Sequence, residues 1–166
     1  MFRPIGGRGE LSDTSEERDR TLLRELADRE AIRDLASSYA HHVWRKDVKA
    51  VVDLFADDGE MDTLTRPLIR GRQELLAAYE EMLGEDEFQP FVHNHVIDLD
   101  GDTAAGTCYI DLRAVIDGRR MMGWGHYDDR YVRVGGQWKF GYRKVNMSTF
   151  APIGRRPGHD TSREEG

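Results

Sequence analysis

The chain has 166 residues, of which 39% are hydrophobic and 33% are charged, and its formal net charge is −7 at pH 7. This size and composition suit a single globular domain with room for a core or an internal cavity. The acidic balance argues against nucleic acid or an anionic membrane surface as a partner, because phosphate groups bind to positive surfaces. A single cysteine excludes an internal disulfide and, with no apolar run of membrane-spanning length, favours a cytoplasmic location.

The two ends of the chain differ in composition from its centre. Residues 1–21 and 154–166 are rich in Gly, Arg, Ser, Asp and Glu and lack apolar periodicity. We therefore expect a disordered or loosely attached arm at the start and a disordered tail at the end. One domain is expected between them, over residues 22–153.

A helical stretch opens this domain, from Arg29 to Phe55. Apolar and small residues recur at helical spacing as far as Val43, which predicts a long helix with one buried face. A charged break at 45–47 and a second apolar set predict a bend and then a short helix. A third helix is predicted over 72–83, with Gly84 ending it in a left-handed cap position.

Strands account for most of the remaining domain. Two short strands are predicted, over 60–64 and 67–70. Four long strands separated by tight turns then predict an antiparallel meander, with the ranges 91–99, 103–116, 119–134 and 137–150. Helices followed by a curved antiparallel sheet form an α+β architecture.

Alternation along the long strands predicts which side chains share a face. The small and apolar residues around Cys108 should lie under the helices, and the aromatic residues Tyr109 and Trp124 on the outer face, where they suit contact between subunits. By the same parity Arg143 lies opposite Trp138 and its apolar neighbours on the last strand.

Four segments of the chain, in this order and spacing, resemble a SnoaL-like domain of the nuclear transport factor 2-like superfamily. They read ADREAIRDLASSYAHHVWRKDVKAVVDLFADDGEMD, LIRGRQELLAAYEEML, VHNHVIDLDGDTAAGTCYI and GHYDDRYVRVGGQWKFGYRKV. Scytalone dehydratase and ketosteroid isomerase are more distant relatives in that superfamily. The resemblance implies a cone-shaped α+β barrel, in which a curved mixed or antiparallel sheet packs around N-terminal helices and encloses an apolar pocket. It also implies homodimers or homotrimers and chemistry that needs no cofactor.

The C-terminal run is most similar to the dehydratase and dehydrochlorinase branch, whose usual machinery is an Asp–His pair with an Arg on the last strand. Laid against that pattern, Trp44 falls where the Asp is expected. Pro90 falls where the His is expected, if Asn94 fixes the register. Arg143 is retained, and Tyr39 lies where some of these dehydratases carry an active-site Tyr.

A slip of one residue would instead recruit Asp47 or His93, and this alternative stays open. His93 and His95 also suggest a metal site, but two outward-facing imidazoles without a convincing carboxylate nearby are the favoured interpretation, so we expect no metal. The same parity turns Asn94 inward, toward a substrate.

Each catalytic candidate has a structural alternative. Tyr39 is either a core aromatic or a hydroxyl that points into the pocket. His42 lies near the apolar helix face, although a His at a helix end is more often a surface or capping residue. Arg143 is either an ion-paired strand residue or a buried cation for an enolate, carboxylate or phenolate, and Tyr127 would share its pocket.

We therefore predict two sets of site residues. The catalytic candidates are Tyr39, Arg143, Tyr127 and His42, and the substrate-binding candidates are Trp44, Met61, Asn94 and Met147. The expected function is a cofactor-independent cyclase, dehydratase or isomerase acting on a polyketide-type or other polycyclic apolar substrate. Two alternatives stay open: a non-catalytic ligand-binding or assembly protein, and the small subunit of a ring-hydroxylating oxygenase.

Overall fold

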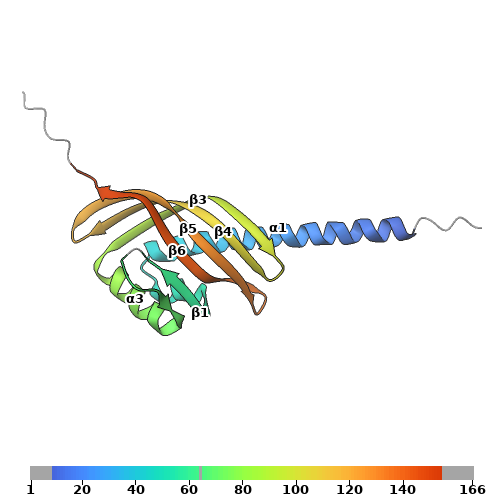
Figure 1. Cartoon of the computed structure of the whole chain (residues 1–166), viewed down its shortest axis with the longest axis horizontal. Coiled ribbons are helices and arrows are strands. Elements are labelled where there is room, and N and C mark those ends of the chain that lie inside the picture. The colour runs from blue at the N-terminus through green and yellow to red at the C-terminus, as the bar shows by residue number, and fades with distance from the viewer. Residues whose placement is uncertain (1–8, 64, 155–166) are drawn as a thin grey trace, which may run out of the picture.

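The computed structural model describes residues 9–63 and 65–154 of the chain. Its helices and strands come in the predicted order (Figure 1). The helices are α1 (Gly9–Trp44), α2 (Val48–Asp53) and α3 (Gly71–Glu85). The strands are β1 (Phe55–Asp62), β2 (Ile69–Arg70), β3 (Glu87–Asp100), β4 (Thr103–Ile116), β5 (Arg119–Val134) and β6 (Gln137–Pro152).

The strands form one curved six-stranded sheet in the order β2-β1-β6-β5-β4-β3. From β3 to β6 each strand pairs antiparallel with the next, which is the predicted meander. β1 joins the other side of β6 in parallel, so the sheet is mixed, and its two edges are not joined. The predicted α+β fold class is confirmed.

β1 begins five residues earlier than the predicted start at Glu60. The amide of Phe140 donates a hydrogen bond to the carbonyl of Leu54, and Phe55 pairs with Phe140. This pairing brings Phe55 into the sheet, where the sequence had suggested the end of a helix.

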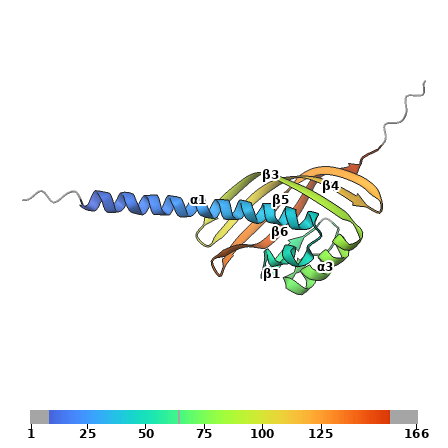
Figure 2. The same ribbon diagram turned by 180° about the vertical axis from the view of Figure 1, so that it is seen from behind.

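Helix α1 begins long before Arg29. Its second half buries Ile32, Leu35, Tyr39 and Val43 under the sheet, at the spacing that the sequence predicted. Residues 14–26 are exposed, and this part of α1 projects beyond the sheet in both views (Figures 1 and 2). None of the described helices is long and apolar enough to cross a membrane.

Residues 9–21 are thus helical, where we expected a disordered or loosely attached arm. The segment contains no proline, and charged side chains one turn apart, such as Glu16 and Arg20, support the helix, whose side chains over residues 14–21 are all exposed. A search for apolar periodicity cannot detect such a helix. Residues 1–8 and the tail from 155 lie outside the described residues.

The prediction for Gly84 was wrong. Helix α3 continues to Glu85, and Gly84 is not among the glycines with positive φ. Asp86 follows in an extended conformation, with φ −109° and ψ 165°, and β3 starts at the next residue. The chain therefore passes from helix to strand without a left-handed residue.

Two irregularities in the strands overturn the parity predictions. In β6 the pairing shifts between Phe140 and Tyr142, so Gly141 is an extra residue, and Arg143 faces inward together with Trp138 and Phe140. In β3 the pairing shifts between His93 and His95. A β-bulge turns the following side chains to the other face.

The bulge in β3 consists of Asn94, whose φ is 45°. Asn94 is exposed, so the prediction that it faces inward was wrong. His95 is the residue that turns inward instead, while His93 stays outside, 3.8 Å from Asp111. The two imidazoles therefore do not share a face.

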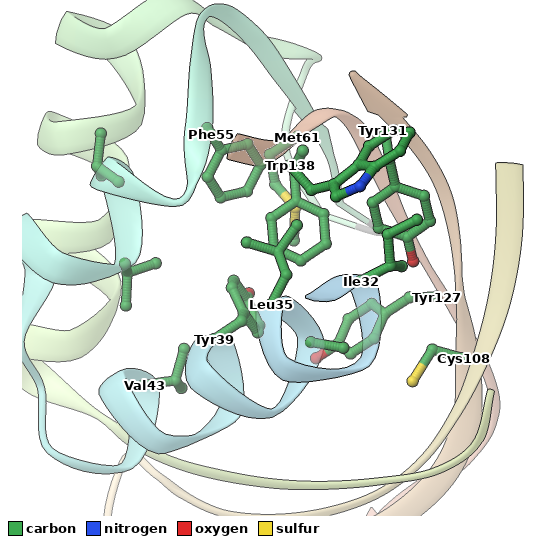
Figure 3. Close-up of a cluster of buried hydrophobic side chains, with 14 of the residues drawn as sticks. Ile32, Leu35, Tyr39, Val43, Phe55, Met61, Cys108, Tyr127, Tyr131 and Trp138 are labelled. Carbon is green, nitrogen blue, oxygen red and sulfur yellow. The ribbon is translucent and has the colours of Figure 1, made fainter. Parts of the chain in front are cut away.

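β4 follows the predicted alternation. Cys108 and Ile110 are buried under the helices, and Tyr109 is exposed on the outer face with Trp124 of β5. Figure 3 shows the inner side, where side chains of α1 meet those of the sheet. Contact between copies through the outer face stays a prediction.

Candidate active site

A cavity of about 370 Å³ lies between α1, α3 and the inner face of the sheet. Apolar side chains make up most of its wall, among them Val43, Met61, Phe88, Ile110, Leu112, Val145, Met147 and Phe150. Its charged wall residues come from α3 and the segments flanking it: Arg66, Glu81, Glu85 and Asp86. Arg66 and Glu81 are joined by two hydrogen bonds of 2.8 Å. A ligand of this cavity would meet mostly apolar surface.

Three buried tyrosines supply polar groups to this wall: Tyr39 from α1, Tyr79 from α3 and Tyr127 from β5. The hydroxyls of Tyr39 and Tyr79 lie 2.9 Å apart. Only one hydrogen can occupy that bond, so one hydroxyl keeps a hydrogen to donate. The hydroxyl of Tyr127 has no hydrogen-bond partner among the described residues. The cavity therefore has two phenolic donors for a ligand.

Burial raises the pKa of Tyr39, and it raises the pKa of Tyr79 and Tyr127 well above the ordinary value of 10.0. The charged form of a phenol is disfavoured away from water. All three tyrosines are therefore neutral at physiological pH. They can donate hydrogen bonds to a ligand, but they are not bases.

Arg143 lies behind two of these tyrosines and is 0% exposed. Its guanidinium carbon is 4.3 Å from the ring centre of Tyr39, 4.0 Å from that of Tyr127 and 3.9 Å from that of Phe140. Asp129 accepts hydrogen bonds from Nε at 2.8 Å and from Nη2 at 2.7 Å. Nη1 is buried and has no hydrogen-bond partner in the described part of the chain.

Arg143 stays positively charged despite its burial. Burial alone would lower its pKa, but the adjacent Asp129 carboxylate outweighs that effect and raises it. A cation against the rings of Tyr39 and Tyr127 favours negative charge on a nearby oxygen and strengthens the two phenols as donors. The arrangement can polarise an oxygen atom of a bound molecule.

The structure brings together five of the eight predicted site residues. Tyr39, Tyr127, Met61 and Met147 line the cavity, and Arg143 lies directly behind it. The other three, His42, Trp44 and Asn94, are not part of the wall. His42 is half-buried with its ring centre 5.3 Å from that of His41, and its Nδ1 has no hydrogen-bond partner within residues 9–63 and 65–154.

Trp44 and Pro90 are neighbours, as the family pattern implies for its Asp and His. The indole Nε1 of Trp44 donates a hydrogen bond of 2.8 Å to the carbonyl of Pro90, and its ring packs edge-on against Phe91. Pro90 lines the cavity, whereas Trp44 is 43% exposed outside it. The residues of the alternative register are also absent from the wall, since Asp47 caps α2 and His93 is on the outer face.

The sequence did not single out Tyr79 or Asp129. Tyr79 belonged to the predicted apolar face of the third helix, and only the position of that helix shows that its hydroxyl meets Tyr39. Asp129 pairs with Arg143 because of the extra residue Gly141. Counting back from the Gly135–Gly136 turn without that bulge places Asp129 opposite Tyr142, so the ion pair could not be predicted.

A curved sheet packed on helices around an apolar cavity is the cone architecture of nuclear transport factor 2-like proteins. The sequence model of the SnoaL-like domain matches residues 24–144, and the chain belongs to this family. A search of curated protein sequences finds no match.

Solved structures with the same fold include enzymes. A candidate scytalone dehydratase from Novosphingobium aromaticivorans DSM 12444 is 21% identical, with a TM-score of 0.71 over 85% of this chain and 97% of the other. The hexachlorocyclohexane dehydrochlorinase LinA-type3 from Novosphingobium barchaimii LL02 is 21% identical, with a TM-score of 0.73 over 79% and 93%. A candidate aromatic ring hydroxylase from Novosphingobium aromaticivorans DSM is 25% identical, with a TM-score of 0.72 over 76% and 94%.

Proposed function

We propose that the chain is a cofactor-independent enzyme that dehydrates, isomerises or cyclises an apolar ring compound of the polyketide type. The observation that carries this proposal is the set of phenolic donors in a mostly apolar wall, backed by the buried cation Arg143. Such donors stabilise negative charge that develops on an oxygen during reaction, and they act most strongly where water is excluded. The fold supports the proposal, since related structures carry dehydratase and dehydrochlorinase names.

The donor set favours reactions in which an oxygen gains negative charge or a proton. In an aldol-type ring closure, an enol carbon attacks a ketone carbon, the ketone oxygen takes a proton from a tyrosine, and the enol proton leaves to water. In a dehydration of a β-hydroxy ketone, the α-carbon proton leaves to water and the β-hydroxyl leaves as water with a proton from a tyrosine. The tyrosine regains its proton from solvent in both cases. Neither reaction changes the oxidation state overall, so neither requires a redox cofactor.

No histidine lines the cavity among the described residues, and its carboxylates, Glu81, Glu85 and Asp86, belong to α3 and the residue after it. With Asn94 fixing the register, Trp44 and Pro90 fall where the family pattern has its Asp–His pair, and Asp47 and His93 of the alternative register lie outside the wall. This favours an acidic or already enolised substrate over one whose proton is difficult to remove.

The same observation favours the second candidate function, a ligand-binding protein on this fold. A binding protein would use the apolar wall and the tyrosine donors without turnover. The third candidate, an oxygenase small subunit, is supported by a similar structure with a ring-hydroxylase name. Co-purification with a large subunit would be its distinguishing result.

The test is a mass-spectrometric turnover screen with hydroxylated polycyclic ketones. We expect Tyr127→Phe to lower kcat/KM about a hundredfold, as the loss of one oxyanion donor does in other enzymes. The matched control is Tyr142→Phe, which removes a hydroxyl that binds Asp62 outside the cavity. Equal activity of the two variants would refute the assignment, and tight binding without turnover of any compound would favour the binding protein.

A further inference from the structure

A series of hydrogen bonds leads from Arg143 away from the cavity. Asp129 Oδ2, which binds Arg143, also accepts a hydrogen bond of 2.8 Å from the hydroxyl of Tyr131. The same hydroxyl oxygen lies 2.9 Å from Nε2 of His95. Asp129 and Tyr131 are buried, and His95 is half-buried. None of the three lines the cavity.

The local fold brings His95 to this position. The bulge at Asn94 turns the imidazole inward, and His95 reaches Tyr131 across the intervening strand β4, where Gly106 lies between them. A Cβ atom on Gly106 would lie 3.3 Å from a ring carbon of Tyr131, 3.5 Å from Nε2 of His95 and 2.7 Å from the Val96 carbonyl. A side chain there would crowd the contact.

The hydrogen atoms in this series of hydrogen bonds have one consistent arrangement. Asp129 can only accept, so the single hydrogen of Tyr131 points to it. The hydroxyl oxygen of Tyr131 must then accept from His95, which requires a hydrogen on Nε2. Burial lowers the pKa of His95, so its ring is neutral near pH 7 and carries its one hydrogen on Nε2.

We propose that His95 and Tyr131 are positioning residues that set the orientation and effective charge of Arg143 through Asp129, and so the donor strength of the cavity tyrosines. The role rests on the proposed function of the cavity. By donating to Asp129, Tyr131 fixes the carboxylate plane and takes up part of its negative charge. Arg143 is then held by Nε and Nη2, and its charge remains effective at the rings of Tyr39 and Tyr127.

The test compares two probes of the same shape, α-tetralone and the hydrocarbon tetralin, of which only the ketone can accept a hydrogen bond. We expect Tyr131→Phe and His95→Leu each to raise the dissociation constant of α-tetralone about tenfold, because a displaced Arg143 no longer strengthens the cavity tyrosines as donors. Tetralin binding should not change. A general loss of packing would weaken both probes. His95→Gln should restore ketone binding, because its amide NH2 can donate to Tyr131 in place of Nε2.

A second readout uses the protein without ligand. Proton NMR of the Arg143 Nε–H group should show slow exchange with water, and Tyr131→Phe and His95→Leu should speed this exchange about tenfold while Tyr142→Phe does not. Nitrogen shifts of His95 should identify the Nε2–H form. Thermal unfolding of each variant shows that it is folded.

Each outcome decides one question. If the Arg143 exchange rate is unchanged in Tyr131→Phe, or if His95→Gln behaves as His95→Leu does, the positioning role is wrong. If Tyr127→Phe weakens α-tetralone binding and neither Tyr131→Phe nor His95→Leu does, the cavity site stands and only the positioning role falls. If the exchange rates respond as expected and no compound is turned over, the catalytic function fails and the positioning role stands.

Discussion

The inner side of the sheet carries two Arg–Asp pairs that differ in burial. Arg143 and Asp129 join β6 to β5, their side chains are both 0% exposed, and the arginine is enclosed by aromatic rings. Arg133 and Asp28 join β5 to α1, and their side chains are 17% and 13% exposed. The second pair is also bound by Trp138, whose indole donates to Asp28 at 3.1 Å and whose ring lies 4.4 Å from the Arg133 guanidinium carbon.

The difference indicates separate roles. A fully buried ion pair gains little net stability, because removing two charges from water costs about as much as their attraction returns. Apolar side chains would hold β5 and β6 together equally well at Asp129 and Arg143. The Arg133–Asp28 pair keeps partial contact with water and fixes α1 against the sheet where the helix leaves the body. We therefore assign the buried Arg143–Asp129 pair a role in the candidate active site and the partly exposed Arg133–Asp28 pair a role in stabilising the fold.

The largest expected effect comes from separating the buried pair. Asp129→Ala leaves Arg143 as an uncompensated buried charge, so we expect the free energy of unfolding to fall by about 3–5 kcal/mol. The double variant Asp129→Leu with Arg143→Met replaces both charges by apolar side chains and should unfold within about 1–2 kcal/mol of the wild type. Urea unfolding followed by tryptophan fluorescence measures both, with Trp138 as a buried reporter.

The double variant also tests the assignment to the site. It should lose the preference for α-tetralone over tetralin while it stays folded. A double variant as unstable as Asp129→Ala would show that the buried pair serves the fold, and the proposed contrast between the two pairs would then fail.

A smaller, pH-dependent effect is expected at the other pair. Burial opposes the charge of Asp28, but the ion pair with Arg133 and the hydrogen bond from Trp138 outweigh it and lower the pKa of Asp28 below the ordinary value of 3.8. Its contribution to stability is therefore present above pH 3.8 and is lost as the pH falls through the lower folded-state value. Asp28→Asn should cost about 1–2 kcal/mol near pH 7.

The difference in the free energy of unfolding between wild type and Asp28→Asn should be nearly constant above pH 3.8 and should narrow as unfolding is measured at lower pH. Arg33 and Glu30 form an exposed ion pair on the same helix, so Glu30→Gln is the matched control and should show a smaller cost at neutral pH. A pH-independent difference at Asp28 would mean that its hydrogen bonds, and not its charge, stabilise the contact.

The sequence predicted the elements of this fold better than it predicted the site. Strand lengths and hairpin turns follow from local patterns, and β4 and β5 have the predicted bounds. The family resemblance placed Tyr39 and Arg143 on the elements that border the cavity. The positions of Asn94, His95 and Arg143 relative to the sheet depend on single extra residues, which alternation cannot reveal.

Contacts between elements that are far apart in the sequence could not be predicted from the sequence either. The hydrogen bond between Tyr39 and Tyr79 joins two helices, and the series of hydrogen bonds from His95 to Arg143 spans four strands. Each of these residues has an ordinary structural interpretation in its own segment. Only the curvature of the sheet and the packing of α3 bring their polar atoms within hydrogen-bonding distance.

The smallest expected effect concerns the part of α1 that is N-terminal to Asp28. Deleting residues 1–21 leaves both Arg–Asp pairs intact and removes no buried side chain among residues 14–21, all of which are exposed. Surface ion pairs such as Arg20–Glu16 contribute little. We expect the free energy of unfolding to change by less than about 0.5 kcal/mol in urea titrations of the shortened chain. A loss above about 2 kcal/mol that grows with protein concentration would show that the projecting helix packs against a second copy. The stability of the protein would then depend on residues 1–21 as well as on the contacts made by Asp28 and the residues after it.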